Sequence, residues 1–254
     1  MKQLFFLLVI SLWGIIIWSI WGAGATKGEE RTDMLYANGH PMKYTPNRVS
    51  LSAYPSTVLI HAPHVEQLPE LPRGCEVTSL SMLLQHAGQE VDKMELAEKV
   101  PKVPYVKEGV HGNPNDGFVG NMYDYKEAGL SVYAGPITKL AEQYMPGQVV
   151  NLSGMDLEGM KKTLLTGSPI LVILASTYDT VPEDTWQTWT TSSGDIRVSR
   201  KIHSVLVTGY DEHFVYVNDP LYPLKHRPIE RNGFVTAWQE FGNQAVALIG
   251  LDQG

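Results

Sequence analysis

Apolar side chains recur at helical spacing in several parts of the chain. Directly after Cys75 they stand at Val77, Leu80, Leu84 and Ala87, with Gly88 following as a C-cap. Two further helices are predicted to begin at an aspartate cap: one at Asp92, with Glu95 three residues on, and one from Asp116 to about Ala128. Three more short helices are predicted over 137–144, 156–165 and 234–241. The first half of the chain is therefore expected to be mostly helical.

Strand patterns dominate the second half. The continuous apolar run 169–175 predicts a buried strand, and 244–251 predicts a last strand. Two stretches rich in β-branched and aromatic residues, 202–210 and 213–220, are joined by Asp211-Glu212 and predict a β-hairpin. With a short strand at 56–60, this order indicates an α+β fold with an antiparallel sheet.

The N-terminus has a different pattern. An apolar run from Leu4 to Ala25 follows Lys2, which supplies the positive flank of an export signal. The run is close to membrane-spanning length, so residues 1–25 are predicted to be a signal peptide or an N-terminal membrane anchor. Residues 26–55 are polar without a clear period and are predicted to be a linker. Residues 56–254 then form one domain, expected outside the cytoplasm on the outer face of the membrane or secreted.

Charge and cysteine content narrow the classes of function. The net charge of −7 over 254 residues argues against nucleic acid as a partner, because such proteins usually need a basic face. Cys75 is the only cysteine, so no disulfide can form within the chain. In an exported protein it is a free thiol or an intermolecular one.

Cys75 stands where a helix is predicted to begin, and unpaired N–H groups there favour the nucleophilic thiolate. Taken alone, a single cysteine is more often a small buried apolar side chain. The predicted hairpin changes this weighting, because His203 lies at the start of its first strand and Asp219 at the end of its second. In an antiparallel hairpin these two ends are neighbours. His203 and Asp219 therefore make a base and an orienting carboxylate for the Cys75 nucleophile.

Three sequence blocks resemble one family of enzymes. The block from Leu71 to Leu80, LPRGCEVTSL, resembles the LPxGCExTSLxML block of bacterial family-39-like cysteine peptidases of the papain-like superfamily. The HSVLVTGY stretch at His203 and the VNDP stretch at Asp219 match two further blocks in the same order. The resemblance covers about residues 58–251 and implies a papain-like fold, in which a helix carrying cysteine packs on a sheet carrying histidine and aspartate.

The resemblance also implies an oxyanion-stabilising glutamine upstream of the cysteine. Gln67 is the residue at that place, although its spacing to Cys75 is wider than in many relatives because Pro69-Glu70-Leu71-Pro72 intervenes. Together with the Cys75 backbone N–H, its amide would stabilise a tetrahedral oxyanion. The alternative for Gln67 is an ordinary solvated loop residue.

A pair of histidines and a long tryptophan-containing segment each have a functional and a purely structural interpretation. His61 and His64 lie three residues apart without an obvious third ligand, so we expect no metal and no cofactor. The long segment 178–199 contains Trp186 and Trp189, which would line a substrate groove, bind a glycan, or simply pack within a surface insertion.

The sequence as a whole predicts an exported cysteine peptidase. Cys75, His203, Asp219 and Gln67 would hydrolyse a peptide or amide bond through an acyl-enzyme. The expected substrate is a peptide or protein, and the cell envelope is one place where it would occur. Two alternatives stay open: acyl or peptidyl transfer by the same residues, and a non-catalytic cell-surface binding module on a peptidase fold.

Overall fold

The computed structural model describes residues 55–251 and, further upstream, the backbone of two three-residue strands, β1 (Leu35–Ala37) and β2 (His40–Met42). These two strands pair antiparallel within the segment expected to be a linker, and they belong to a unit, residues 1–52, distinct from the one that starts at residue 53. The predicted export segment 4–25 lies outside the described residues. Within 55–251, no helix combines the length and apolar character needed to cross a bilayer.

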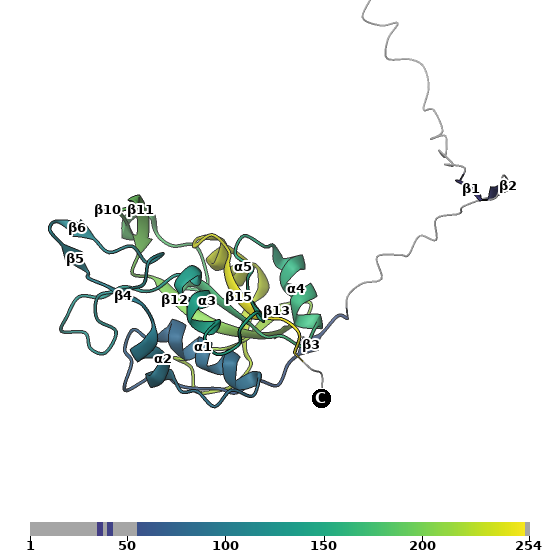
Figure 1. The fold of residues 1–254 in the computed structure, drawn as a ribbon, viewed down its shortest axis with the longest axis horizontal. Coiled ribbons are helices and arrows are strands. Elements are labelled where there is room, and N and C mark those ends of the chain that lie inside the picture. Colours follow the sequence, from purple (N-terminus) through teal and green to yellow (C-terminus); the bar gives the residue numbers. More distant parts are fainter. Residues whose placement is uncertain (1–34, 38–39, 43–54, 252–254) are drawn as a thin grey trace, which may run out of the picture. The chain divides into compact units, whose positions relative to one another are not determined.

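A central antiparallel sheet organises the domain (Figure 1). Its strands in spatial order are β14 (Arg227–Glu230), β13 (Phe214–Asn218), β12 (Ile202–Tyr210), β9 (Ile170–Ala175), β15 (Gln244–Leu248) and β8 (Val149–Asn151), and β3 (Val58–Leu59) pairs with the end of β12 beyond the part paired to β9. All of these pairings are antiparallel, so the predicted mixed fold with an antiparallel sheet is confirmed. The predicted hairpin corresponds to β12 and β13.

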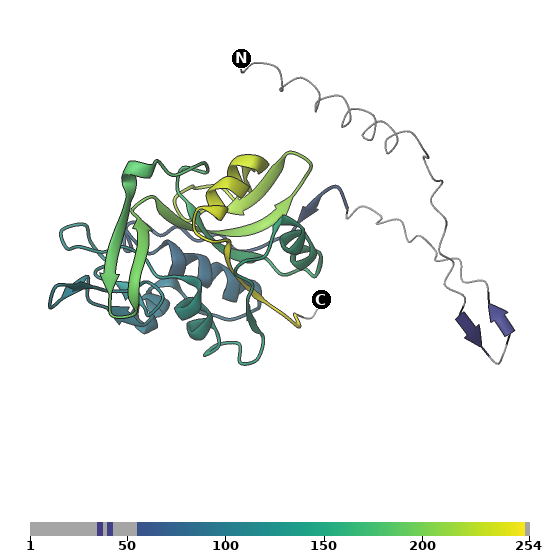
Figure 2. The ribbon, with the colours of Figure 1, turned by 90° about the horizontal axis from the view of Figure 1, so that it is seen from above.

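Helices cover the sheet on two sides. They are α1 (Cys75–His86), α2 (Lys93–Lys99), α3 (Ala134–Ala141), α4 (Leu157–Leu165) and α5 (Arg231–Gln239), with a 3₁₀ turn at Glu183–Thr185. Helix α1 packs against β12 and β9, whereas α5 packs against β9, β13 and β14. Figures 1 and 2 both show α1 and α5 separated by the central strands. The helix that begins at Cys75 therefore lies directly on the strand that carries His203.

Burial rather than amphipathicity holds α1 in place. Its first ten residues are all buried, including Leu80, Leu83 and Leu84, which are completely inaccessible to solvent. Burying each such leucine contributes about 1.5–3 kcal/mol. The helix is thus embedded between the sheet and its neighbouring helices, and its N-terminus is fixed at one point beside β12.

Aspartate caps mark the starts of α2 and α4, and the sequence indicated the first of them, Asp92. The Asp92 carboxylate accepts hydrogen bonds from the N–H groups of Met94 and Glu95 at the start of α2. The Asp156 carboxylate accepts one from Gly159 at the start of α4. Helices α3 and α5 each begin three residues before the predicted start, at Ala134 and Arg231.

One predicted helix, from Asp116 to Ala128, is wrong. The segment instead forms β7 (Phe118–Val119), which pairs with β4 (Lys102–Val103), and then a series of bends. The Asn121 side chain accepts hydrogen bonds from the N–H groups of Tyr123 and Asp124, which folds the chain into a turn in place of a helix. Residue 129 must be glycine here, because a Cβ would meet the Asn121 carbonyl at 2.1 Å.

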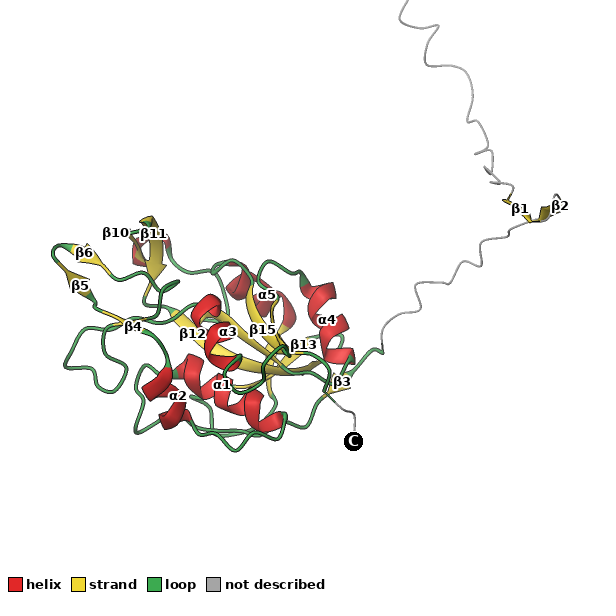
Figure 3. Cartoon of the chain, viewed as in Figure 1, coloured by secondary structure: helices red, strands yellow, loops and turns green. Residues whose placement is uncertain are grey.

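The long segment 178–199 contributes two strands to a second, four-stranded sheet at one end of the domain (Figure 3). Its strands in order are β11 (Gly194–Ser199), β10 (Trp186–Thr191), β6 (Val110–His111) and β5 (Val106–Lys107). Trp189 is only 4% exposed, stacks on His111 with ring centroids 4.2 Å apart, and meets Tyr105 edge-on. Trp189 is therefore a packed core residue of this sheet, which agrees with the insertion alternative rather than with a binding groove.

Candidate active site

Cys75 is the first residue of α1 and follows a tight turn. The turn is closed by a hydrogen bond from the Gly74 N–H to the Leu71 carbonyl, 3.0 Å long. A Cβ at position 74 would lie 2.5 Å from the Leu71 Cβ, so a larger residue would push the turn apart. The Thr78 hydroxyl donates to the Gly74 carbonyl at 2.8 Å and ties the turn to the helix. These contacts fix the thiol at the helix N-terminus.

His203 and Asp219 meet across the β12–β13 pair. His203 is the second residue of β12, and Asp219 directly follows Asn218, the last residue of β13. Their side chains are joined by a hydrogen bond of 2.7 Å between His203 Nε2 and Asp219 Oδ1, and both residues are buried. The structure thus places in direct contact the histidine and the carboxylate that the sequence predicts to be a base and its orienting group.

Asp219 is held by more partners than the sequence indicated. Its Oδ2 accepts hydrogen bonds from the Tyr178 hydroxyl at 2.8 Å and from Arg227 Nη1 at 2.6 Å, and its Oδ1 also accepts one from the Leu221 N–H at 2.9 Å. No motif marked Tyr178 or Arg227. The only sequence signal for them is that Tyr178 follows a buried strand and Arg227 a predicted hairpin.

Opposing effects set the charge of Asp219. Burial disfavours the carboxylate, but the hydrogen bond from His203 and the electrostatic attraction between the two groups, with the Leu221 and Tyr178 bonds, outweigh it and hold the pKa of Asp219 well below its usual range. An ionised carboxylate only accepts hydrogen bonds, so His203 Nε2 must donate. A neutral His203 then carries its lone pair on Nδ1, which is the tautomer that a general base needs.

The thiol and its neighbour Glu76 are both buried. Burial raises the pKa of the Cys75 thiol well above its ordinary value, and the charge and hydrogen bonding of Glu76 raise it further. Burial likewise raises the pKa of Glu76, although its Oε1 accepts hydrogen bonds from the Ser131 hydroxyl and the Val132 N–H. The helix N-terminus favours the thiolate, whereas burial and Glu76 favour the protonated thiol, so a neighbouring base would help Cys75 to become a nucleophile.

Gln67 lines the same cavity as Cys75, but its side-chain amide donates to main-chain carbonyls of its own loop. It is buried, and its Nε2 donates to the carbonyls of Leu71 at 3.0 Å and Pro72 at 3.1 Å. Its backbone N–H donates to the Pro220 carbonyl at 3.0 Å, which joins this loop to the residue after Asp219. To donate to an oxyanion, Nε2 must release one of its two carbonyl partners, so the role of Gln67 stays a prediction.

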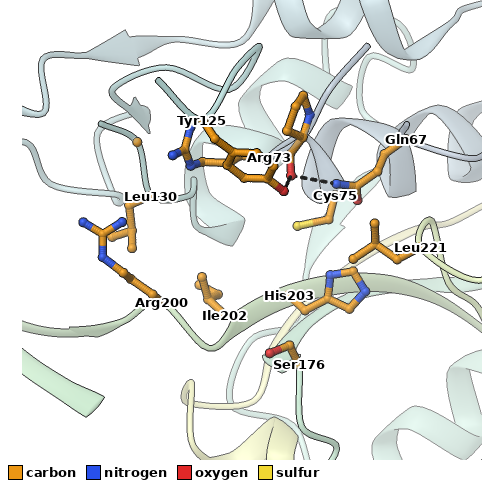
Figure 4. Close-up of a pocket in the computed structure, with 12 residues that line it drawn as sticks. Gln67, Arg73, Cys75, Tyr125, Leu130, Ser176, Arg200, Ile202, His203 and Leu221 are labelled. Atoms are coloured by element: carbon orange, nitrogen blue, oxygen red, sulfur yellow. Dashed lines mark hydrogen bonds between the residues drawn. The ribbon is translucent and has the colours of Figure 1, made fainter. Parts of the chain in front are cut away.

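A cavity of about 340 Å³ connects these residues. Figure 4 shows the Cys75 sulfur and the His203 ring facing it from opposite walls. The lining residues are Gln67, Pro72, Arg73, Cys75, Tyr125, Gly129, Leu130, Ser176, Arg200, Ile202, His203 and Leu221. Of the four residues predicted from the sequence, three line this cavity, and Asp219 lies behind His203.

One of the two histidines weighed as a metal pair has another partner. His64 Nε2 donates to the Asp219 main-chain carbonyl at 3.2 Å, so this histidine braces the loop that carries the carboxylate. Among the described residues, no group of three or more histidine, cysteine, aspartate or glutamate side chains is arranged to hold a metal ion.

Comparison with known proteins gives a consistent result. The model of the peptidase C39-like family matches residues 59–246. The Bacillus subtilis (strain 168) protein YvpB, itself uncharacterised, is 42% identical over 198 residues, which cover 78% of this chain and 76% of YvpB. The crystal structure of a candidate C39-like peptidase from Bacillus anthracis is 43% identical and superposes with a TM-score of 0.75, covering 76% of this chain and 97% of that one.

Proposed function

Because the chain belongs to the peptidase C39-like family, we propose that it is a cysteine peptidase with a papain-like arrangement of Cys75, His203 and Asp219. The observation that carries the proposal is the 2.7 Å bond between His203 and Asp219 beside the cavity that Cys75 and His203 both line. This combination supplies a nucleophile, a base with a fixed tautomer and a place for the substrate carbonyl. A binding module would need none of these.

The proposed reaction begins with proton transfer. His203 Nδ1 takes the Cys75 proton as the sulfur attacks the carbonyl carbon of a peptide or amide bond. The resulting imidazolium is stabilised by Asp219, and the oxyanion by the Cys75 backbone N–H and the Gln67 amide. His203 then gives the proton to the leaving amine, which departs as the C–N bond breaks and leaves a thioester on Cys75.

Water completes the cycle. His203 removes a proton from a water molecule, whose oxygen attacks the thioester carbonyl. Collapse of this second tetrahedral intermediate breaks the C–S bond, returns the proton to the thiol and releases the carboxylic acid product. The raised pKa of Cys75 fits a mechanism in which the thiolate forms as substrate reacts, rather than one that rests as an ion pair.

A peptide digest tests the proposal directly. The full-length protein is incubated with a peptide library and with cell-envelope fragments, and new termini are read by mass spectrometry beside a Cys75→Ala variant. We expect new N- and C-termini with the wild type alone. Absence of new termini, or the same termini with Cys75→Ala, would contradict a cysteine peptidase.

We further propose that the domain acts outside the cytoplasm. The support is the apolar run from Leu4 to Ala25 behind Lys2. Fractionation of cells that express the full-length chain should place it in the membrane or the medium. Mass spectrometry of its N-terminus then separates a cleaved signal from an anchor. Full-length protein in the soluble cytoplasmic fraction would contradict this placement.

A further inference from the structure

The cavity at Cys75 has an unusual charge for this molecule. The chain carries a net charge of −7, yet the lining residues include two arginines, Arg73 and Arg200, and no aspartate or glutamate. The nearby acids Glu76 and Asp219 are buried behind Cys75 and His203 and do not line the cavity. A substrate in this cavity therefore meets positive charge.

Arg73 is held in place without being neutralised. Its Nη1 donates to the main-chain carbonyls of Asn121, at 3.1 Å, and of Asp124. Its guanidinium lies 4.8 Å from the centre of the Tyr125 ring, and the Tyr125 hydroxyl donates to the Pro72 carbonyl at 2.8 Å. These contacts fix the orientation of the guanidinium, while none of them supplies a counter-charge.

Arg200 is held in a similar way. Its Nη2 donates to the Tyr105 hydroxyl at 2.8 Å, which is a neutral partner. By contrast, Arg197 pairs with Glu183 at 2.8 Å, and Arg227 pairs with Asp219 at 2.6 Å. Within residues 55–251, neither arginine of the cavity forms an ion pair with a carboxylate. Two oriented guanidinium groups are thus available to a ligand.

The arginines lie on one side of the reacting groups. Figure 4 shows Arg200 and Leu221 on opposite sides of Cys75 and His203, with Leu130 beside Arg200 and Ile202 between Arg200 and the reacting groups. Leu221 is 53% exposed and offers an apolar contact at its end. A bound peptide would therefore meet positively charged groups on one side of its scissile bond and an apolar contact on the other.

We propose that the Arg73–Arg200 side of the cavity binds a carboxylate of the substrate, within a few residues of the scissile bond. This inference rests on the proposed peptidase function and names its substrate class: peptides with an aspartate or glutamate side chain, or a free C-terminal carboxylate, at that place. The planar guanidinium fork matches a carboxylate in two parallel hydrogen bonds. Because the molecule as a whole is negative, the preference must come from these local contacts.

Matched substrates test the inference. Cleavage positions found in the peptide digest are resynthesised as pairs that differ only by Glu against Gln, Asp against Asn, or a C-terminal acid against an amide. We expect kcat/KM of the full-length protein to favour the charged member of one pair by about tenfold or more, since charge-assisted bonds are the stronger ones. The pair of peptides that shows the preference identifies whether the site binds a side-chain carboxylate or a C-terminal carboxylate.

Variants then assign the preference to residues. Arg200→Gln and Arg73→Gln are each expected to remove most of it, and Arg73→Lys retains the charge if Arg73→Gln disturbs the loop. Arg197→Gln is the matched control, because Arg197 lies on β11 near Arg200 but does not line the cavity. It should keep the preference unchanged.

The outcomes separate this inference from the proposed function. Cysteine-dependent cleavage without a charge preference, or a preference that survives in the Arg73→Gln, Arg200→Gln double variant, would overturn the carboxylate site and leave the peptidase intact. If the digest shows no cleavage, library peptides are synthesised in the same acid and amide pairs and tested for binding to the Cys75→Ala variant. Tighter binding of the acidic member that depends on Arg200 supports the site apart from catalysis, and equal binding overturns it.

Discussion

Asp219 is a buried carboxylate whose four partners fix both its charge and the ring of His203. Replacing it by asparagine keeps the volume but removes the charge that balances Arg227. Loss of a buried, charge-assisted hydrogen-bond partner typically costs about 1.5–3 kcal/mol. We therefore expect the Asp219→Asn variant to lose about this much free energy of unfolding in urea at pH 7, whereas Asp184→Asn, at an exposed position, loses almost none.

The same variant has a predicted pH dependence. Because the pKa of Asp219 is lowered on folding, its stabilising effect is present above its ordinary value of 3.8 and is lost as the pH falls toward the folded value. The difference in unfolding free energy between wild type and Asp219→Asn should therefore shrink as the pH falls below that value. A difference that grows with acid would contradict the assigned ionisation.

Glu76 acts on the thiol beside it. Its charge and hydrogen bonding are the causes, after burial, that raise the pKa of Cys75. In the Glu76→Gln variant the amide oxygen still accepts from Ser131, but the negative charge is gone. We expect the pH dependence of Cys75 alkylation by iodoacetamide to move to lower pH. Glu98→Gln, at an exposed position on α2, serves as the control, and an unmoved Glu76→Gln profile would rule out this coupling.

The second sheet depends on one aromatic cluster. Trp189 of β10 contacts His111 and Tyr105, which come from a part of the chain nearly 80 residues away. Truncating a buried tryptophan typically costs about 3–5 kcal/mol. We expect Trp189→Ala to lower the urea midpoint accordingly, while Thr188→Ala, at an exposed position on the same strand, leaves it within experimental error. Equal midpoints would show that the cluster contributes little.

Elements with strong local signals could be predicted from the sequence. The apolar run of β9, the hairpin of β12 and β13, and the aspartate cap of α2 each follow from a few neighbouring residues. The segment 116–128 could not be predicted, because its turns depend on the Asn121 side chain and on close contact between residues 120 and 129. Strands β5 with β6 and β10 with β11 form two local hairpins, but their union in one sheet depends on the pairing of Thr191 with His111, a contact between distant segments that local periodicity does not report.

The residues of the candidate site also fall into those that the sequence predicts and those that only the fold reveals. Cys75, His203 and Asp219 are found in the sequence because two elements, a helix start and a hairpin, bring them together. Tyr178 and Arg227 complete the surroundings of Asp219 by contacts that depend on how β14 and the loop after β9 pack, and no spacing announces them. The arginines of the cavity likewise become apparent only once the fold brings residues 73 and 200 to the same cavity.

At the scale of the whole molecule, the packing of α1 on β12 joins residues that are 128 positions apart. The proposed function depends on this packing, because it brings Cys75 and His203 to one cavity, where we propose that His203 activates the thiol. Since Cys75 is the only cysteine of the chain, any thiol chemistry of the purified protein reports on this residue alone. The activation can therefore be measured without knowing the substrate.

The most direct measurement is the rate of Cys75 alkylation by iodoacetamide at pH 7, followed by the intact mass of the full-length protein. We compare wild type, His203→Ala and, as control, His213→Ala at an exposed position. The account predicts that His203→Ala reacts at least about tenfold more slowly, in line with the contribution of a general base, while His213→Ala matches wild type. Equal rates for wild type and His203→Ala would contradict a Cys75 nucleophile activated by His203.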